Sequence, residues 1–305
     1  MAPLVEISDL TKTYSGGTVR ALDALTVSVE SGLIGLVGAN GAGKSTLFRI
    51  LLGLAQPDAG SVRVAGIDVA DDPIGVRSRL GFMPEHDCLP TDQSAADVVS
   101  TLGELAGLPP HDARQRASDI LDLVGLDEAR FRPVEGFSTG MRQRTKLAQA
   151  LVADPHLVLL DEPTAGLDPA GRHEMLELVR RLGRFGISVL MATHLLDDVQ
   201  STCDQVVMID GGRLVGAGRT EDLLETSGVV RVDVGGQGDR LVAVLGQVLG
   251  ADATLLADGS VELPVAGDDA LDAIVAAVAD AGLPLHALSS RRATLDGLFL
   301  GADAS

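Results

Sequence analysis

A glycine-rich loop, between an apolar run and an amphipathic helical pattern, contains the residues of this chain best suited to phosphate chemistry. Gly38 and Gly43 precede Lys44 and Ser45 at the spacing G-x-x-x-x-G-K-S. Glycines let the backbone curl closely around a ligand, and N–H groups at the start of a helix can bind phosphate oxygens. Lys44 can reach β- and γ-phosphates, and the Ser45 hydroxyl is a suitable ligand for Mg²⁺. A turn that binds nothing is the alternative, but the strand-loop-helix context argues against it. We therefore expect a nucleoside triphosphate to be bound by Gly38, Ala39, Asn40, Gly41, Ala42, Gly43, Lys44, Ser45 and Thr46.

A second apolar run, LVLLD at 157–161, leads into two adjacent carboxylates. Asp161 lies at the mouth of the predicted sheet, where it can hold Mg²⁺, usually through water. Glu162 is placed to polarise a water molecule that attacks the γ-phosphate. An exposed acidic turn is the alternative. Both this pair and the phosphate loop follow predicted strands, which favours a shared site.

Three further residues are ordinary when taken alone. In FSTGMRQRTKLAQAL (137–151), Ser138 is suited to cap a helix and Gly140 permits close backbone approach. His194 follows the apolar segment SVLMAT, where a lone histidine usually has a structural role. Tyr14 is the only tyrosine and can be a surface residue in a turn. Their interpretation depends on the rest of the chain.

The elements that must position these residues alternate between strand and helix, as is typical of an α/β core. The three strands nearest the candidate carboxylates and histidine are continuous apolar runs, which predicts buried parallel strands. Strands are expected at 4–10, 25–32, 61–64, 156–161, 187–194 and 205–210, and helices at 94–106, 111–124, 139–152 and 170–185.

The composition restricts the class of partner. The net charge is −19, from 43 acidic and 24 basic residues, and no basic stripe is visible, so we expect no nucleic-acid partner. No apolar run approaches the ~20 residues of a membrane-spanning helix. The first segment, MAPLVEISDL, lacks the basic and apolar regions of a signal peptide. Cys88 and Cys203 lack zinc-site spacing and are expected to be free thiols, and these features together predict a cytoplasmic protein.

The character of the sequence changes after about residue 226. The segment 226–305 contains no lysine, and its pattern predicts the order β-α-β-β-α-β followed by a last helix. That order is compatible with a small α+β domain of ferredoxin-like fold. We therefore expect an accessory domain at 226–305, with strands at 229–234, 253–256, 260–264 and 285–289 and helices at 240–249, 268–282 and 292–299.

Taken together, the motifs resemble those of the ATP-binding cassette (ABC) ATPases. The resemblance covers residues 4 to about 225 and implies a P-loop NTPase cassette, at 1–225, with a mixed sheet core and a helical subdomain at about 87–152. The motifs occur in the family order: the phosphate loop at 38–46, the Q-loop at 81–86, the signature at 138–142, Walker B at 157–162, the D-loop at 165–168 and the switch histidine at 194.

The resemblance implies that two cassettes bind two ATP molecules head to tail between them. The start of the signature helix, with Ser138, Thr139, Gly140 and Met141, then contacts the γ-phosphate held by the opposite subunit. Asp168 communicates between the two sites. Hydrolysis removes the bridging γ-phosphate and so separates the subunits.

The same resemblance implies roles within the subunit's own site. His194 contacts the γ-phosphate and orients Glu162, so that Glu162, His194 and Lys44 form the catalytic set. The Tyr14 ring stacks on adenine, and Val19 completes that face. The implied Mg²⁺ ligands are Ser45, Asp161 and Glu85.

The sequence departs from the commonest family pattern in three motifs. Glu85 replaces the usual glutamine of the Q-loop, so it can bind Mg²⁺ but adds negative charge near the γ-phosphate. Thr139 and Met141 give STGM where SGGQ is commoner, and Ala39 stands where proline is frequent. These variants resemble a branch of single-cassette ATPases of bacterial exporters, similar to the daunorubicin-resistance type, that often carries an extra C-terminal region.

The expected function is that of a motor subunit that hydrolyses ATP with Mg²⁺ and drives export of a drug, antibiotic or lipid-like cargo through a separate integral-membrane permease. The second ATP-binding subunit is either another copy of this chain or a paralogue. The resemblance implies a peripheral protein at the cytoplasmic face of the cell membrane. An importer motor with a regulatory C-terminal domain is one alternative. A soluble, non-transport ABC ATPase is the other, and the acidic balance argues against a ribosome or DNA surface for it.

Overall fold

The computed structural model describes residues 3–225, 228–249, 253–265 and 269–291. The chain divides into two compact units, Met1–Ala217 and Gly218–Ser305. The predicted boundary, between residues 225 and 226, lies just beyond this division. The composition changes where the second unit's sheet begins, whereas the preceding helix α8 (Thr220–Glu225) already belongs to that unit.

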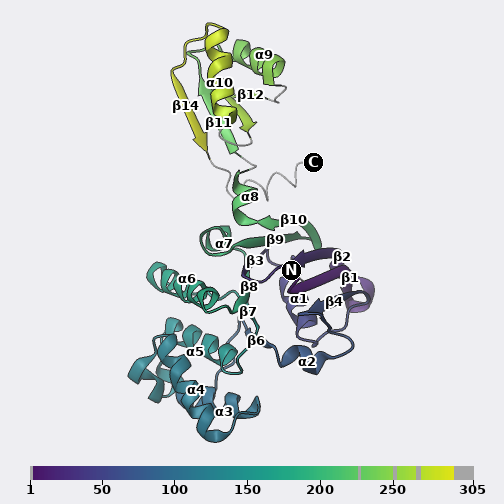
Figure 1. Ribbon diagram of the computed structural model, residues 1–305, viewed down its shortest axis with the longest axis vertical. Helices are drawn as coiled ribbons and strands as arrows, with labels where there is room; N and C mark the ends of the chain where they lie inside the picture. Colours follow the sequence, from purple (N-terminus) through teal and green to yellow (C-terminus); the bar gives the residue numbers. More distant parts are fainter. Residues whose placement is uncertain (1–2, 226–227, 250–252, 266–268, 292–305) are drawn as a thin grey trace. The chain divides into compact units, whose positions relative to one another are not determined.

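The first unit has a central sheet of six strands. Neighbouring pairs from β9 to β6 are parallel, as the buried apolar runs predicted. Three of its strands, β3, β7 and β8, are buried along their whole length. The order is β10 (Arg213–Arg219), β9 (Gln205–Asp210), β3 (Leu33–Val37), β8 (Ser188–Thr193), β7 (Leu157–Asp161) and β6 (Leu80–Met83) (Figure 1).

A second sheet of the same unit is antiparallel. Its order is β2 (Val19–Val29), β1 (Val5–Tyr14), β4 (Ala59–Val64) and β5 (Ile67–Asp68). Residues of both sheets form one apolar core with helix α1 (Lys44–Leu51). Phe48 of α1 is 1% exposed and packs edge-on against Phe82, with ring centroids 6.3 Å apart. This packing fixes the helix that begins at the end of the phosphate loop.

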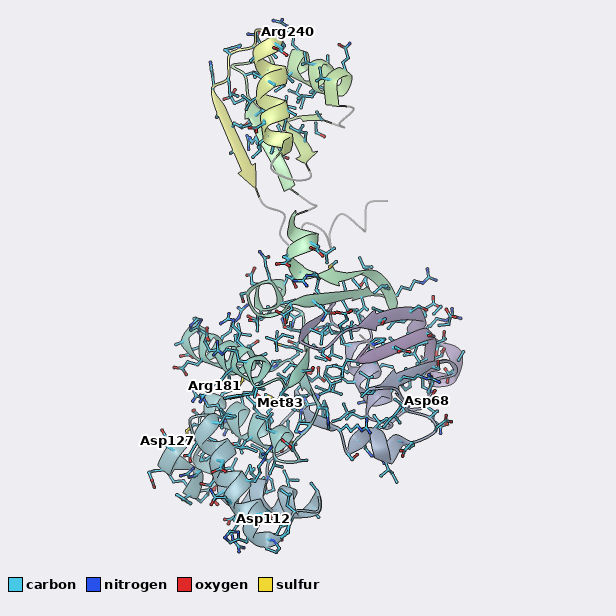
Figure 2. The ribbon with its side chains drawn as sticks, in the orientation of Figure 1. Asp68, Met83, Asp112, Asp127, Arg181 and Arg240 are labelled. Carbon is cyan, nitrogen blue, oxygen red and sulfur yellow. The ribbon has the colours of Figure 1, made fainter. Side chains whose placement is uncertain are left out.

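Three helices lie within the range expected for the helical subdomain, next to strand β6 (Figure 1). They are α3 (Ala95–Leu105), α4 (Pro110–Leu123) and α5 (Thr139–Leu151). A Cβ added at Gly81 would lie 2.0 Å from the Ala150 carbonyl oxygen, so the backbones of β6 and α5 touch there. In the view of Figure 2, Met83, the last residue of β6, lies above Asp112 of α4.

The other helices of this unit are short or cover the central sheet. Helices α2 and α7 and strands β5 and β10 have no clear sequence periodicity and were not predicted. Helix α7 packs directly on β3, because Val199 occupies the space beside Gly35. The bounds are α2 (Pro73–Arg77), α6 (Pro169–Arg184) and α7 (Leu196–Thr202), with 3₁₀ turns at Ser15–Gly17, Asp127–Phe131 and Val134–Gly136.

Replacing Gly35 with alanine is expected to lower the free energy of unfolding by about 2 kcal/mol, the usual cost of overpacking a core. The added Cβ would lie 2.3 Å from Val199 Cγ1. Denaturant unfolding measures the effect. Gly136→Ala is the matched control, because its added Cβ would be 3.7 Å from its nearest neighbour. Equal midpoints and slopes for the two variants would contradict the close packing of α7 on β3.

The second unit has its own antiparallel sheet and apolar core. Strand β13 lies between β12 and β11, and β14 pairs with the other edge of β11. The element order β-α-β-β-α-β is the predicted one and is compatible with a ferredoxin-like fold. The helix expected at 292–299 lies outside the described residues. The bounds are β11 (Gly228–Asp233), α9 (Gly238–Leu249), β12 (Thr254–Leu255), β13 (Val261–Val265), α10 (Asp269–Asp280) and β14 (Ala287–Arg291).

Candidate functional site

The phosphate loop is packed so closely that two of its glycines have no room for a side chain. A Cβ at Gly38 would lie 2.4 Å from the carbonyl oxygen of Ile209. Gly43 has φ +108, in the left-handed region, and a Cβ there would lie 2.4 Å from the Ala21 carbonyl oxygen. The loop therefore rests on β9 and β2, and α1 begins directly after it at Lys44.

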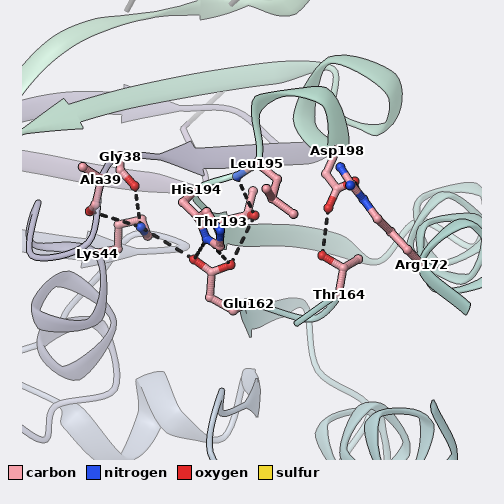
Figure 3. A network of polar contacts seen from close by, with 10 residues as sticks. All are labelled: Gly38, Ala39, Lys44, Glu162, Thr164, Arg172, Thr193, His194, Leu195 and Asp198. Atoms are coloured by element: carbon pink, nitrogen blue, oxygen red, sulfur yellow. Dashed lines mark hydrogen bonds and ion pairs between the residues drawn. The ribbon is translucent and has the colours of Figure 1, made fainter. Parts of the chain in front are cut away.

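Lys44 is a buried cation that crosses the loop, with 7% of its surface exposed. Its Nζ donates to the Gly38 carbonyl oxygen at 2.5 Å and to that of Ala39 at 3.4 Å. The same Nζ lies 3.7 Å from Oε1 of Glu162 (Figure 3). Lys44 thus joins the phosphate loop to the carboxylate predicted to polarise water.

Glu162 is held from several sides. Its carboxylate lies 3.0 Å from Nδ1 of His194 and accepts a hydrogen bond from the Thr193 hydroxyl at 3.3 Å (Figure 3). Its backbone N–H donates to the Ala192 carbonyl oxygen at 2.9 Å. Glu162 has φ +48, a conformation that non-glycine residues rarely adopt and that is found at functional sites. His194 is 48% exposed at its side chain, so the carboxylate lies between a buried lysine and an open histidine.

The three predicted Mg²⁺ ligands, Ser45, Asp161 and Glu85, line one pocket together with Lys44, Glu162 and His194. Burial raises the pKa of Asp161, and the negative charges of Glu85 and Glu162 raise it further. Lys44 and a hydrogen bond from Ser45 act in the opposite direction. A divalent cation would relieve this crowding of negative charge, so the donor set fits Mg²⁺. No group of three or more His, Cys, Asp or Glu among the described residues is arranged to hold a metal alone. Mg²⁺ takes one or two carboxylates and completes its shell with water and phosphates.

A buried charge network lies behind this pocket. Asp198 is 1% exposed and accepts hydrogen bonds from the Thr164 hydroxyl at 2.8 Å and from Arg172 Nε at 2.6 Å. Thr164 follows Glu162 by two residues, and Asp198 lies in α7 just after His194. The network ties the segments of Glu162 and His194 to each other (Figure 3).

The residues predicted to bind adenine are not among those that line the pocket. Tyr14 and Val19 lie opposite each other where β1 pairs with β2. The Lys12 ammonium lies 5.5 Å from the centre of the Tyr14 ring, and Val19 is 55% exposed. Stacking of adenine on this pair stays a prediction.

The signature residues and Asp168 also lie outside the pocket lining. Ser138 caps α5, where its Oγ accepts from the Met141 N–H at 3.3 Å, and both Ser138 and Thr139 are exposed. Asp168 caps α6 by accepting from the Gly171 N–H at 2.8 Å. Contact with a nucleotide held by another subunit stays a prediction for these residues.

Several residues at the site were missed by sequence reasoning. Ala21 and Ala165 line the pocket. Thr193 could have been found from its position directly before His194. Lys146 is one of only three lysines in the chain, yet it is 1% exposed on a helix read as an ordinary arginine-rich one. The sequence around Lys146, RQRTKLAQAL at 142–151, gave no signal of this burial.

Two expectations from composition can be compared with the structure. Cys88 and Cys203 are free, the first exposed and the second buried. Among the described helices, none is both long and apolar enough to span a bilayer.

Known proteins resemble this chain in sequence and in structure. The family model for ABC transporters matches residues 22–165. The daunorubicin resistance ATP-binding protein of Streptomyces coeruleorubidus is 36% identical over 293 residues, which covers 93% of this chain and 91% of that protein. The Nod factor export ATP-binding protein I of Ralstonia nicotianae is 34% identical over 267 residues, which covers 87% of this chain and 80% of that protein.

Solved structures agree with the fold. The cbiO1 protein of Clostridium perfringens, part of the ABC transporter complex cbiONQ, has a TM-score of 0.67 and 28% identity, covering 73% of this chain and 91% of its own. A dimeric ATP-binding cassette in a post-hydrolysis state with ADP and Pi has a TM-score of 0.65 and 24% identity. The match covers 71% of this chain and 98% of that cassette. These findings confirm the family resemblance and the cassette fold predicted from the motifs. The chain therefore belongs to the ATP-binding subunits of the ABC transporter family and is an ATPase.

Proposed function

We propose that this chain is the motor subunit of an exporter, working as a dimer of cassettes with ATP between them and with a separate membrane permease. The observation that carries the motor part of the proposal, ATP hydrolysis, is the joint contact of the Glu162 carboxylate with Lys44 and His194 beside the phosphate loop. An anion-binding loop, a cation and a water-polarising carboxylate are the parts that phosphoryl transfer to water requires.

In the proposed reaction each side chain has one task. The loop N–H groups and Lys44 hold the phosphates and balance their charge. Glu162 accepts a proton from the attacking water as the oxygen approaches the γ-phosphorus. His194, from its position at 3.0 Å, orients that carboxylate and faces the γ-phosphate from the open side of the pocket. The strained backbone of Glu162 aims its side chain at this point.

Mg²⁺ is the proposed metal, with Ser45, Asp161 and Glu85 as the residues that would hold it directly or through water. When bound, it neutralises charge that develops on the transferring phosphoryl group. Glu85 gives this site one more negative charge than a glutamine would. We expect this charge to raise the site's preference for a divalent cation.

The dimer part of the proposal is supported by the exposed start of α5. Ser138 and Thr139 are exposed and are not among the residues that line the pocket of their own subunit. A second cassette, turned head to tail, would bring its phosphates to this helix start, where free N–H groups favour anions. Loss of the γ-phosphate removes that contact and releases the subunits.

The direction of transport is supported by relatives whose names concern resistance or export. They include the daunorubicin resistance and Nod factor export proteins described above and the linearmycin resistance ATP-binding protein of Bacillus subtilis, 31% identical over 237 residues. A drug, antibiotic or lipid-like cargo is therefore proposed. The protein would be located at the cytoplasmic face of the membrane through its permease.

The test is a pull-down with the tagged Glu162→Gln protein from the native host's solubilised membranes in Mg-ATP. Bound proteins are identified by mass spectrometry. A multi-span membrane protein at stoichiometric level is the expected result. The control is Glu162→Gln combined with Lys44→Ala, which should not hold ATP and should capture less. Capture of soluble partners only would contradict the transport role, and import instead of export by vesicles containing the complex would contradict the proposed direction.

A further inference from the structure

Lys146 is the buried cation of the first unit that the reaction described above does not use. It lies in α5 with 1% of its surface exposed. Its Nζ donates to the carbonyl oxygens of two consecutive residues, Pro84 at 2.9 Å and Glu85 at 2.8 Å. One ammonium thus holds the backbone of the segment 84–85 at the point where Glu85 enters the nucleotide pocket.

The same helix holds this segment at a second point. Gln149 lies one turn after Lys146, and its Nε2 is 3.4 Å from the sulfur of Cys88. Before the segment, Gly81 brings the backbone of β6 against the Ala150 carbonyl. The loop 84–88 is therefore attached to α5 along one helix face, and its position follows the position of that helix.

Two of the charges around Lys146, those of Glu85 and Asp161, belong to side chains that line the nucleotide pocket. Burial lowers the pKa of Lys146, and negative charges that include those of Asp87, Glu85 and Asp161 oppose that shift. Burying a lysine costs free energy unless its ammonium is hydrogen-bonded. The described hydrogen bonds of Lys146 go to neutral carbonyl oxygens, so its positive charge remains to act on these carboxylates. Glu85 is the extra negative charge in this group relative to the common glutamine.

We propose that Lys146 is a positioning residue for ATP hydrolysis, which fixes the loop 84–88 to α5 and so holds the Glu85 carboxylate in the nucleotide pocket beside Asp161. The inference rests on the nucleotide site proposed above and does not depend on the direction of transport. Because Lys146 lies in α5, whose N-cap is Ser138, it also makes the position of Glu85 depend on the helix whose start is proposed to meet the second nucleotide.

Lys146→Met in the full chain tests this, because methionine has similar length but no donor and no charge. Without nucleotide, amide hydrogen exchange at residues 85–88 is expected to become about 10-fold faster than in the wild type. With Mg-ATP, kcat is expected to fall about 10-fold through misplacement of Glu85, with KM changed less than about 2-fold. Lys146→Arg, which keeps charge and donors, is expected to recover most of both effects.

Arg144→Met is the matched control. Arg144 is also a cation of α5 that donates to consecutive carbonyls, those of Val124 and Gly125, but it does not touch the loop. The proposal would be overturned if Arg144→Met and Lys146→Met changed amide hydrogen exchange at residues 85–88 and kcat by equal amounts. Faster exchange spread evenly over the first unit would also overturn it, because Lys146 would then only stabilise the fold.

A double-mutant cycle with Glu85→Gln shows whether Lys146 acts through Glu85. The kcat loss caused by Lys146→Met is expected to be clearly smaller in the Glu85→Gln background. Equal losses in the two backgrounds would overturn the proposal. If Lys146→Met does not fold, Lys146→Gln, which keeps a donor, enters the same cycle with the same criteria. A wild-type protein that hydrolyses ATP but captures no permease would contradict the transport proposal alone.

Discussion

Replacement of Glu162 by glutamine is expected to lower the rate of ATP hydrolysis at least about 100-fold while ATP binding persists. Glutamine keeps the size of the side chain but cannot accept a proton from water. The contacts of Lys44 explain why ATP binding should survive. Its Nζ still donates to the Gly38 carbonyl oxygen at 2.5 Å when residue 162 carries no charge. Steady-state phosphate release measures hydrolysis, and a fluorescent ATP analogue measures binding.

The control for Glu162→Gln is Glu128→Gln, which removes one carboxylate from an exposed position outside the pocket. It should retain wild-type hydrolysis. If Glu162→Gln keeps more than about one tenth of the wild-type rate, Glu162 is not the general base. Light scattering on the same variant in saturating Mg-ATP should detect a dimer, and a monomer under those conditions would contradict the ATP-bridged dimer for the isolated subunit.

Replacement of Lys44 by alanine is expected to weaken ATP binding on the order of 100-fold, equivalent to about 3 kcal/mol. The ammonium is 7% exposed and already close to the loop that receives the phosphates. Its loss removes charge-assisted hydrogen bonds that solvent cannot replace at a buried position. Isothermal titration with ATP and Mg²⁺ measures the change.

Arg49→Ala is the matched control for Lys44→Ala. It removes a positive charge from the same helix α1, at an exposed position. Its affinity for ATP should stay within about 2-fold of the wild type, because exposed charges are screened by solvent and salt. Equal affinities of the Lys44→Ala variant and the wild type would remove Lys44 from the binding site.

The phosphate loop shows how much of a site can be inferred from local sequence. Its predicted binding groups lie within residues 38–46, so the spacing itself determines which backbone N–H groups and side chains can meet one ligand. Asp161 and Glu162 were predicted for the same reason, because they directly follow a continuous apolar strand. The three parallel strands were also predicted, since a strand buried on both faces needs apolar side chains at every position.

The contacts of Glu162 could be predicted only in part. That His194 should orient it followed from family resemblance, and the distance of 3.0 Å required β7 and β8 to be neighbours in the sheet. Strand order is a long-range property that periodicity within one segment does not contain. The hydroxyl of Thr193 and the left-handed backbone of Glu162 depend on the same pairing.

Lys146 and α7 mark where sequence reasoning failed. A lysine on an arginine-rich helix is expected to face solvent. Only the packing of α5 on β6 at Gly81 shows that the ammonium of Lys146 is enclosed with the Pro84 and Glu85 carbonyls. Helix α7 is too short for its periodicity to be distinguished from a loop.

The sequence by itself determined the family and the cassette fold and predicted the phosphate loop and the two carboxylates, because each depends on residue types at fixed short spacing. The tertiary structure alone decided the distances at which Glu162 meets Lys44 and His194, the left-handed backbone of Glu162, and the contact of Lys146 with the loop of Glu85. The physical reason is that these contacts join residues far apart in the chain. They form only when strand order and helix packing bring their backbones together.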